Sequence, residues 1–174
     1  MKSAYKYIAE SLQTSDKKSK LIEWRTQSSV QRLPRPTNPG RAKALGWRAK
    51  QGFVIVRVKI KKGLRKRPMP QKGRKNSKFG LYFSPGVSIQ RMAEQRAGKK
   101  YRNMEILNSY YIGEDGVSKF YEVMMVDRVH PSVLANKDAR KIAMQRGRVF
   151  RGLTAAGRRG KSLRRRDKIR TYLD

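Results

Sequence analysis

The sequence predicts an α+β fold: a small mixed or antiparallel sheet with helices packed on it, plus long basic extended segments and a basic C-terminal tail. The periodic segments follow the order helices, strand, helix, strand, strand, which is typical of this class. Lys and Arg number 44 against 12 acidic residues, for a net charge of +32 in 174 residues. A chain of this length and charge allows one domain with a small core, because like charges oppose compaction.

The N-terminal part is predicted to be helical. Apolar residues at helical spacing predict a helix over residues 3–12. A second helix is expected to begin at Ser15 or Asp16 and to stop before Pro34.

A basic crossing leads from these helices to the first strand. Three prolines predict an extended segment over residues 33–40, and a short helix is expected over residues 42–50. An apolar β-branched run, followed by alternating apolar and basic residues, predicts a strand over residues 53–61. Its second half should bury one face and turn three cations outward: Arg57, Lys59 and Lys61.

The next elements complete the predicted core. Residues 62–79 contain almost no apolar residues, so we expect a long basic loop. Ser84 is expected to cap a helix that Gly98 ends. Two strands, over residues 104–112 and 119–127, are predicted to form a hairpin.

The C-terminal part carries a weaker pattern. Gly and Arg interleave over residues 145–161, which predicts a segment that does not pack on itself and becomes ordered only on RNA. Residues 163–170 could form a cationic helix once their charge is neutralised. We therefore divide the chain into N-terminal helices (1–31), a basic Pro/Gly crossing (32–52), an α+β core with its basic loop (53–130) and a basic RNA-binding C-terminal extension (131–174).

The distribution of acidic residues points to a polyanionic partner. From Trp24 through Ala93 there is no Asp or Glu, whereas 19 of these positions are Lys or Arg. The alternative is a merely solvated basic face, but charge runs of this length rarely serve solubility alone. RNA phosphate is the complement that we expect.

The candidate RNA-binding residues are the cations of these basic stretches together with one interleaved aromatic residue. Guanidinium groups can hold phosphates bidentately, and aromatic rings can stack on exposed bases. The candidates are Arg32, Arg35, Arg41, Lys43, Trp47, Arg48, Lys50, Arg57, Lys59, Lys61, Lys62, Arg65, Lys66, Arg67, Lys72, Arg74, Lys75, Lys78, Arg146, Arg148, Arg151, Arg158, Arg159, Lys161, Arg164, Arg165 and Arg166. For Trp47, a plain core position is the stronger alternative.

Other polar residues favour structural roles over catalysis. His130 is the one histidine and there is no cysteine, which excludes a multi-histidine metal site and thiolate chemistry. Glu114 and Asp115 fit a solvated turn, while Glu105 and Glu122 are expected to pair with Arg or Lys at the sheet. We expect no enzymatic activity, cofactor, metal or small-molecule substrate.

Three rival classes of protein fit the sequence less well than an RNA-binding protein. A DNA-binding architectural protein would share the charge but usually shows a groove-reading helix or minor-groove arm, and neither is clear here. An RNA-modifying enzyme would need a site that the sequence lacks. No apolar run approaches the ~18 residues of a membrane span, so no membrane partner is expected and a cytoplasmic or nuclear location remains.

Four stretches, in order, resemble a known family. They are Ala4–Ile8, Arg35–Thr37 with Ala49–Ile55, Leu107–Asp115 and Arg151–Arg158. Together they are similar to the large-subunit ribosomal protein family fifteen-e, and the resemblance covers nearly the whole chain.

The resemblance implies a structural constituent of the large ribosomal subunit in the cytoplasm. Its partners would be large-subunit ribosomal RNA and neighbouring large-subunit proteins, and it would have no catalytic activity and no cofactor. A shorter stretch after Pro70 and an end at Asp174 depart from the family's eukaryotic pattern, which favours an archaeal type.

Overall fold

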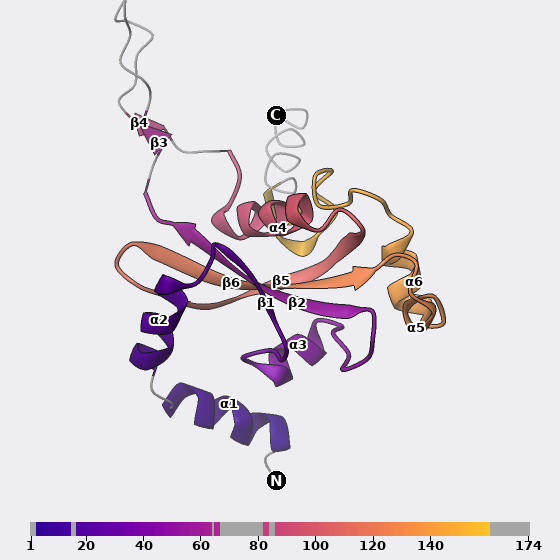
Figure 1. Ribbon diagram of the computed structural model, residues 1–174, viewed down its shortest axis with the longest axis horizontal. Helices are drawn as coiled ribbons and strands as arrows, with labels where there is room; N and C mark the ends of the chain where they lie inside the picture. Colours follow the sequence, from indigo (N-terminus) through magenta and orange to yellow (C-terminus); the bar gives the residue numbers. More distant parts are fainter. Residues whose placement is uncertain (1–2, 15–16, 64, 67–81, 84–85, 161–174) are drawn as a thin grey trace, which may run out of the picture.

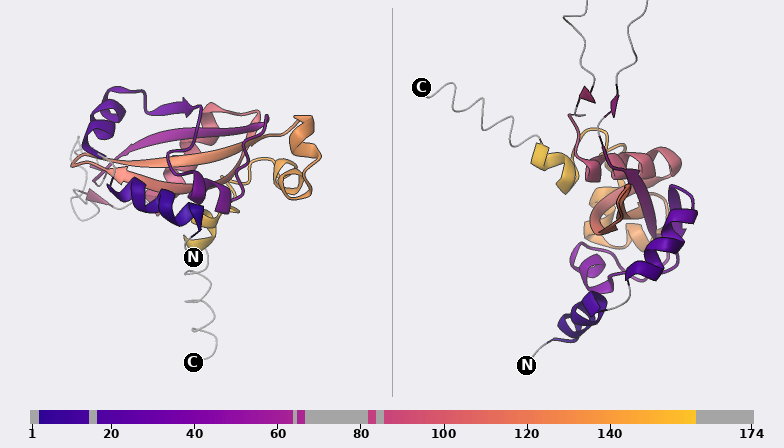
Figure 2. Two further views of the ribbon diagram at one scale, coloured as in Figure 1. Left: turned by 90° about the horizontal axis from the view of Figure 1, so that it is seen from below. Right: turned by 90° about the vertical axis from the view of Figure 1, so that its left-hand side faces the viewer.

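The structure is a computed structural model that describes residues 3–14, 17–63, 65–66, 82–83 and 86–160 (Figure 1). Its centre is a four-stranded antiparallel sheet in the order β1-β2-β6-β5. The strands are β1 (Val30–Leu33), β2 (Phe53–Lys61), β5 (Met104–Glu114) and β6 (Ser118–Asp127). Helices lie on both faces of the sheet (Figure 2), so the predicted α+β class is confirmed.

The central strands pair as the apolar patterns predict. β2 pairs with β6 along its full length, from Phe53 opposite Val126 to Lys61 opposite Ser118. β5 and β6 form the predicted hairpin, and the register of β5 shifts twice, between Ile106 and Asn108 and between Tyr111 and Gly113. The prediction that strand and hairpin share one sheet is therefore confirmed.

One face of the sheet is covered by α4 (Ile89–Lys100). The even-numbered residues of β2 from Val54 to Ile60 pack there with Ala93 and Ala97 of the helix. The cap differs from the expectation: the Ser88 side chain accepts from the backbone of Arg91, while Ser84 lies outside the described residues. Gly98 does not end the helix either, because α4 continues to Lys100.

The other face is covered by α3 (Pro39–Ala44), α5 (Pro131–Leu134) and α6 (Lys137–Ala143). The expectation of a helix over 42–50 was wrong in its bounds. Asn38 caps α3 by accepting from the backbone of Arg41, so the helix begins at Pro39, earlier in the chain than expected. The helix then stops before Gly46, whose φ of +97° suits glycine.

The N-terminal segment contains one element that the sequence analysis missed. Helices α1 (Ala4–Thr14) and α2 (Lys17–Thr26) match the predicted helices at their starts. The second helix was expected to run towards Pro34, but it ends at Thr26, and β1 pairs with β2 instead. Pairing with a neighbouring strand decides the conformation of residues 30–33, and local spacing cannot reveal it.

The segment after α6 packs against the domain, contrary to expectation. Val149 is 2% exposed and Thr154 is fully buried, and residues 155–160 are helical. The expectation that residues 145–160 do not pack was therefore wrong. The predicted helix over 163–170 lies outside the described residues. Of the predicted loop 62–79, the structure describes only residues 62–63 and β3 (Arg65–Lys66). β3 pairs with β4 (Tyr82–Phe83).

Candidate nucleic-acid interface

Among the described residues, several carboxylates lie inside the molecule rather than on its surface. Glu94 and Glu122 are fully buried, and Glu105 is 5% exposed. Buried carboxylates need hydrogen-bond donors, because an unpaired buried charge is costly. Each of the three has such donors, so the surface around them keeps its positive charge.

Glu94 joins α4 to two other segments. Its carboxylate accepts from the hydroxyl groups of Ser109 at 2.6 Å and Thr154 at 2.5 Å. Burial raises the pKa of Glu94, and these two hydrogen bonds oppose the rise. Thr154 also accepts from the backbone of Gly157 at 3.2 Å within the C-terminal segment, so the bond from Thr154 to Glu94 holds that segment against the helix.

Glu122 likewise joins separate segments, on the opposite face of the sheet. Its carboxylate accepts from the backbone N–H and hydroxyl of Thr37 and from the hydroxyl of Tyr110. Burial raises the pKa of Glu122, while the hydrogen bonds from Thr37 and Tyr110 oppose the rise. Burial and the nearby carboxylate also raise the pKa of Tyr110, which keeps its hydroxyl protonated as a donor. The expected pairing of Glu122 with a cation is thus replaced mainly by neutral donors.

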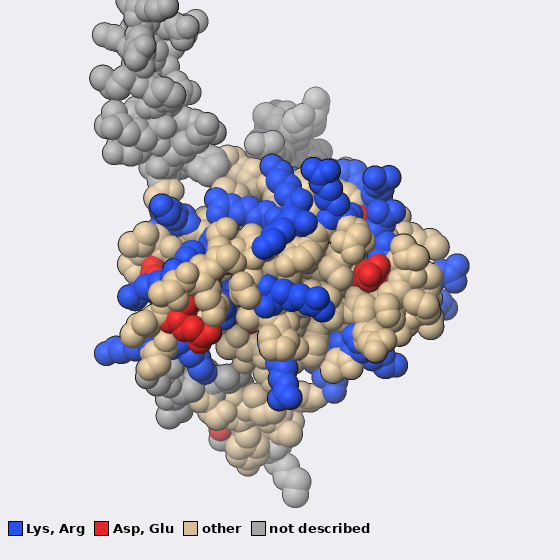
Figure 3. Space-filling view, in the orientation of Figure 1, with Lys and Arg blue, Asp and Glu red and all other residues tan. Residues whose placement is uncertain are grey.

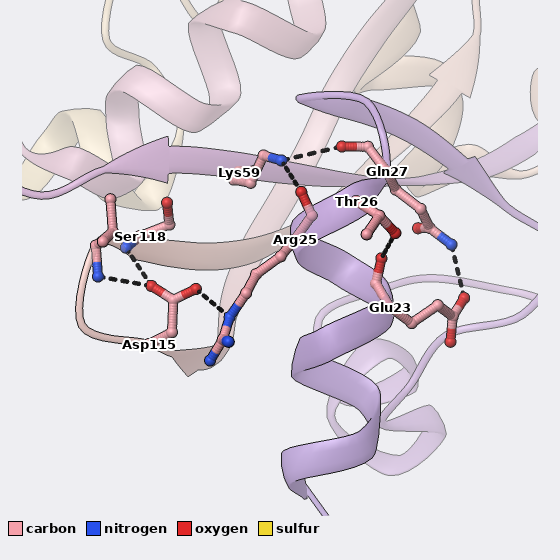
Figure 4. A network of polar contacts seen from close by, with 8 residues as sticks. Glu23, Arg25, Thr26, Gln27, Lys59, Asp115 and Ser118 are labelled. Atoms are coloured by element: carbon pink, nitrogen blue, oxygen red, sulfur yellow. Dashed lines mark hydrogen bonds and ion pairs between the residues drawn. The ribbon is translucent and has the colours of Figure 1, made fainter.

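Two carboxylates at the hairpin turn pair with cations. Glu114 lies 3.1 Å from Lys62 and 3.3 Å from Lys119. Asp115 accepts from Arg25 at 3.1 Å and from the backbone of its own turn (Figure 4). The pKa of Glu114 is lowered chiefly by the hydrogen bond from Lys62, and that of Asp115 by the backbone N–H of Ser118. At this end of the sheet, two carboxylates therefore offset the charge of two of the three cations that pair with them.

Two groups of cations stand out among those that the described residues expose. The crossing surface contains predicted residues from β1 to the start of β2: Arg32, Arg35, Arg41, Lys43, Arg48 and Lys50. The α4 surface contains exposed cations of the helix and of the turns beside it: Arg96, Lys99, Lys100, Arg102 and Arg146. Lys and Arg gather over the upper part of the face in Figure 3, where Figure 1 places α4.

The fold also brings together predicted residues that are distant in sequence. Arg48, Arg148 and Arg158 line one pocket of about 400 Å³, between the loop after α3, α6 and the C-terminal segment. The walls include apolar Leu107 and Ile142 and also acidic Asp138. Arg48 and Arg158 are exposed there, and exposed guanidinium groups can bind phosphate and stack on bases.

Besides Lys62, which pairs with Glu114, three predicted RNA-binding residues that are at least partly buried have internal contacts instead. Arg57 was expected to face outward, but it is 6% exposed, lies 4.7 Å from the centre of the Trp24 ring and donates to Gln27. Lys59 donates to the backbone carbonyls of Arg25 and Gln27 at 2.7 and 3.0 Å (Figure 4). The expected outward cationic face of β2 was wrong for these two residues, because α2 covers it; Lys61 is exposed.

Arg148 is the third internal cation. It is 7% exposed and donates to the carbonyls of Ile106, Leu107 and Leu153. A guanidinium group has five N–H donors, so it can donate hydrogen bonds to several carbonyls at once. Arg148 therefore joins the C-terminal segment to β5.

Several predicted residues lie outside the described side chains. They are Arg65, Lys66, Arg67, Lys72, Arg74, Lys75, Lys78, Lys161, Arg164, Arg165 and Arg166.

Comparison with known proteins decides the family. The family model described as Ribosomal L15, Ribosomal_L15e, matches residues 1–172. The chain belongs to the ribosomal L15e family. It is similar to the large ribosomal subunit protein eL15 of the archaeon Methanocorpusculum labreanum, with 50% identity over 144 residues, which are 82% of this chain and 74% of the relative. This relative agrees with the archaeal type that the sequence predicts.

The stretches that resemble ribosomal L15e supply donors to two of the three buried carboxylates, Glu94 and Glu122. Thr37 and Tyr110 bind Glu122, and Thr154 binds Glu94. These stretches therefore fix the fold that presents the cations, in addition to carrying cations themselves.

The one histidine of the chain has a structural role. His130 caps α5, where its Nδ1 accepts from the backbone of Ser132 at 3.2 Å. Within the described residues, no cluster of three His, Cys, Asp or Glu side chains could hold a metal ion. The described helices include none that could cross a membrane.

The cations of α4 and α6 were not among the predicted residues, whereas the preferred core role of Trp47 was right. Trp47 is half-buried and packs in the cluster that covers the second face of the sheet. The missed cations lie on exposed positions of helices: Arg96, Lys99, Lys100, Lys137, Arg140 and Lys141. Basic residues opposite the apolar stripe of α4 were the signal that could have identified them.

Proposed function

We propose that the crossing surface and the α4 surface bind ribosomal RNA. Within the described residues, neither surface is neutralised by carboxylates of its own, since Glu94, Glu105 and Glu122 are buried. Exposed cations of this density bind phosphate by releasing condensed counterions. This separation of buried acids from exposed bases is the observation that carries the proposal.

The protein is a structural constituent of the large ribosomal subunit and not an enzyme. Its partners are ribosomal RNA and neighbouring ribosomal proteins, and its location is the cytoplasmic ribosome. Basic residues beyond Gly160 and in the loop 62–79 belong to the proposal on the strength of their sequence alone. We also retain the division into segments 1–31, 32–52, 53–130 and 131–174 as a proposal, with residues 131–160 packed on the core.

Sedimentation tests this proposal. Tagged protein expressed in an archaeal host should move with the large-subunit peak of a sucrose gradient and should leave it after ribonuclease treatment. Protein that stays at the top of the gradient, or that sediments with DNA and resists ribonuclease, would overturn it. An architectural DNA-binding protein would give the second result.

A further inference from the structure

A cationic pocket lies beside the C-terminal end of α4. It has a volume of about 420 Å³ and is bounded by α4, the start of β5 and the turn after α6. Lys99, Arg102 and Arg146 line it and are exposed. Within the described part of the chain, no carboxylate forms an ion pair with these three side chains.

An aromatic ring forms one wall of this pocket. Phe150 lines it and remains 46% exposed. Its backbone carbonyl accepts from Arg91 of α4 at 3.4 Å, which fixes the turn that carries the ring. At Gly98 a Cβ would lie 3.7 Å from Cζ of Phe150 and 3.2 Å from Val149, so glycine keeps this side of the pocket open.

The remaining lining is apolar apart from one occupied carboxylate. Met104, Ile106 and Val149 contribute apolar surface. Glu105 is 5% exposed, and its carboxylate accepts from the backbone of Gly147 at 2.8 Å. Three cations therefore face the pocket against one buried acid, and the pocket has a net positive charge.

We infer that this pocket binds one unstacked base of ribosomal RNA against the ring of Phe150, while Lys99, Arg102 and Arg146 hold the phosphates beside that base. Pockets of roughly 300–1,000 Å³ are the usual size for small-molecule ligands, so a single base fits. Proteins recognise splayed RNA bases by stacking on aromatic rings, with basic groups along the backbone. The inference rests on the proposed function and adds that this pocket selects an unstacked base of the RNA.

A second exposed ring provides a matched comparison. Tyr111 is 50% exposed, but it packs edge-on against Tyr121 and does not line this pocket. Exposure of a ring alone is common in proteins and indicates nothing. The combination of ring, pocket and unpaired cations distinguishes Phe150.

The test compares normal and abasic RNA. Dissociation constants of the full chain are measured by fluorescence anisotropy for a single-stranded oligoribonucleotide and for one of equal length without bases. Phe150→Ala should reduce the preference for the normal oligonucleotide by on the order of fivefold, because the variant cannot stack on the base while its phosphate contacts remain. Phe150→Tyr and Tyr111→Ala should keep the preference.

Each result has a defined meaning. Arg102→Ala and Arg146→Ala should weaken binding of both oligonucleotides alike, since both retain phosphates. An unchanged preference in Phe150→Ala, with unfolding temperature also unchanged, overturns the base pocket and leaves the proposed function standing. If the wild-type chain binds neither oligonucleotide in a salt-dependent way, the proposed function itself fails.

Discussion

Glu94 shows how a single side chain can tie three segments together in a chain that is mostly basic. Its carboxylate accepts hydrogen bonds from hydroxyl groups of β5 and of the segment that follows α6. The surrounding residues include Arg91 and Arg148, whose charges favour the ionised form, yet burial has the larger effect and raises the pKa. Protonation of this group is therefore coupled to folding.

We expect the stability contribution of Glu94 to depend on pH. A raised pKa in the folded state means that the contribution is fully present below the ordinary pKa of 4.5 and is lost as pH rises through the folded value. The free energy of unfolding of the wild type, relative to Glu94→Gln, should thus be more favourable near pH 4 than near pH 8. Urea unfolding at both pH values in high salt measures this difference.

Glu94→Ala provides the control, because it also removes the acceptor for both hydroxyl groups. Relative to Glu94→Gln, it should cost about 1–3 kcal/mol at either pH, since neither variant titrates at this position and the buried hydroxyls would lose their partner. A difference between wild type and Glu94→Gln that does not change with pH would show that Glu94 is ionised in the folded state with an ordinary pKa.

At the scale of elements, α2 and the C-terminal segment are held by a few specific contacts rather than by extended apolar stripes. Lys59 of β2 donates to carbonyls at the end of α2, as Figure 4 shows, and Trp24 packs on Phe120 with ring centres 5.4 Å apart. A cation at the C-terminal end of a helix is favourable because of the helix dipole. These contacts dock α2 on the sheet.

Lys59→Ala should loosen α2 without unfolding the sheet. We expect a decrease in stability of about 1 kcal/mol and faster amide hydrogen exchange in Lys17–Thr26. Lys61→Ala is the matched control, since Lys61 is exposed two residues further along the same strand. Equal exchange in the two variants would mean that the contacts of Lys59 do not hold the helix.

The C-terminal segment depends on a close approach between two glycines. A Cβ at Gly157 would lie 2.6 Å from Cα of Gly152 and 2.8 Å from its carbonyl carbon, and both are backbone atoms that cannot turn away. Gly157→Ala should cost about 1–3 kcal/mol by overpacking. Gly160→Ala, where a Cβ meets nothing within 4 Å, should leave the unfolding temperature nearly unchanged. Similar destabilisation in both variants would contradict this explanation.

The predictability of these elements follows from the range of the interactions that form them. β2, the hairpin and α4 were predictable, because their apolar residues repeat with a regular period along the chain. β1 was not, since its four residues depend on pairing with β2. The packing of residues 145–160 was missed because it depends on the long-range contacts of Thr154 and Arg148, which composition cannot show.

At the scale of the whole molecule, charge is sorted by depth and by location. The crossing and α4 surfaces were only partly predictable: the sequence identifies basic runs, but it does not tell which cations a neighbouring helix covers. Arg57 and Lys59 illustrate the difficulty. They alternate with apolar residues in the same way whether the face of β2 that carries them meets water or α2. The cations of α4, by contrast, are scattered along the sequence, and only the folded helix shows that they lie together on one exposed surface.

Salt dependence of RNA binding should distinguish paired from unpaired cations. Replacing Arg35, Arg41 and Arg48 by Ala should flatten the plot of log K against log salt by about 0.7 for each phosphate that the variant no longer binds. The control replaces Arg25, Lys62 and Lys119, which removes the same formal charge but takes cations that pair with Glu114 and Asp115. Equal slopes in the two triple variants would mean that total charge alone determines binding.

The two register shifts of β5 have a consequence for the protein before it meets RNA. A strand on the border of a sheet exposes N–H and C=O groups that can recruit a strand from another molecule, and bulges disturb the regular spacing that such recruitment needs. On the opposite border, β1 offers four residues, too few for an extended pairing. Both borders thus discourage self-association into aggregates, so that newly made chains are kept available for assembly.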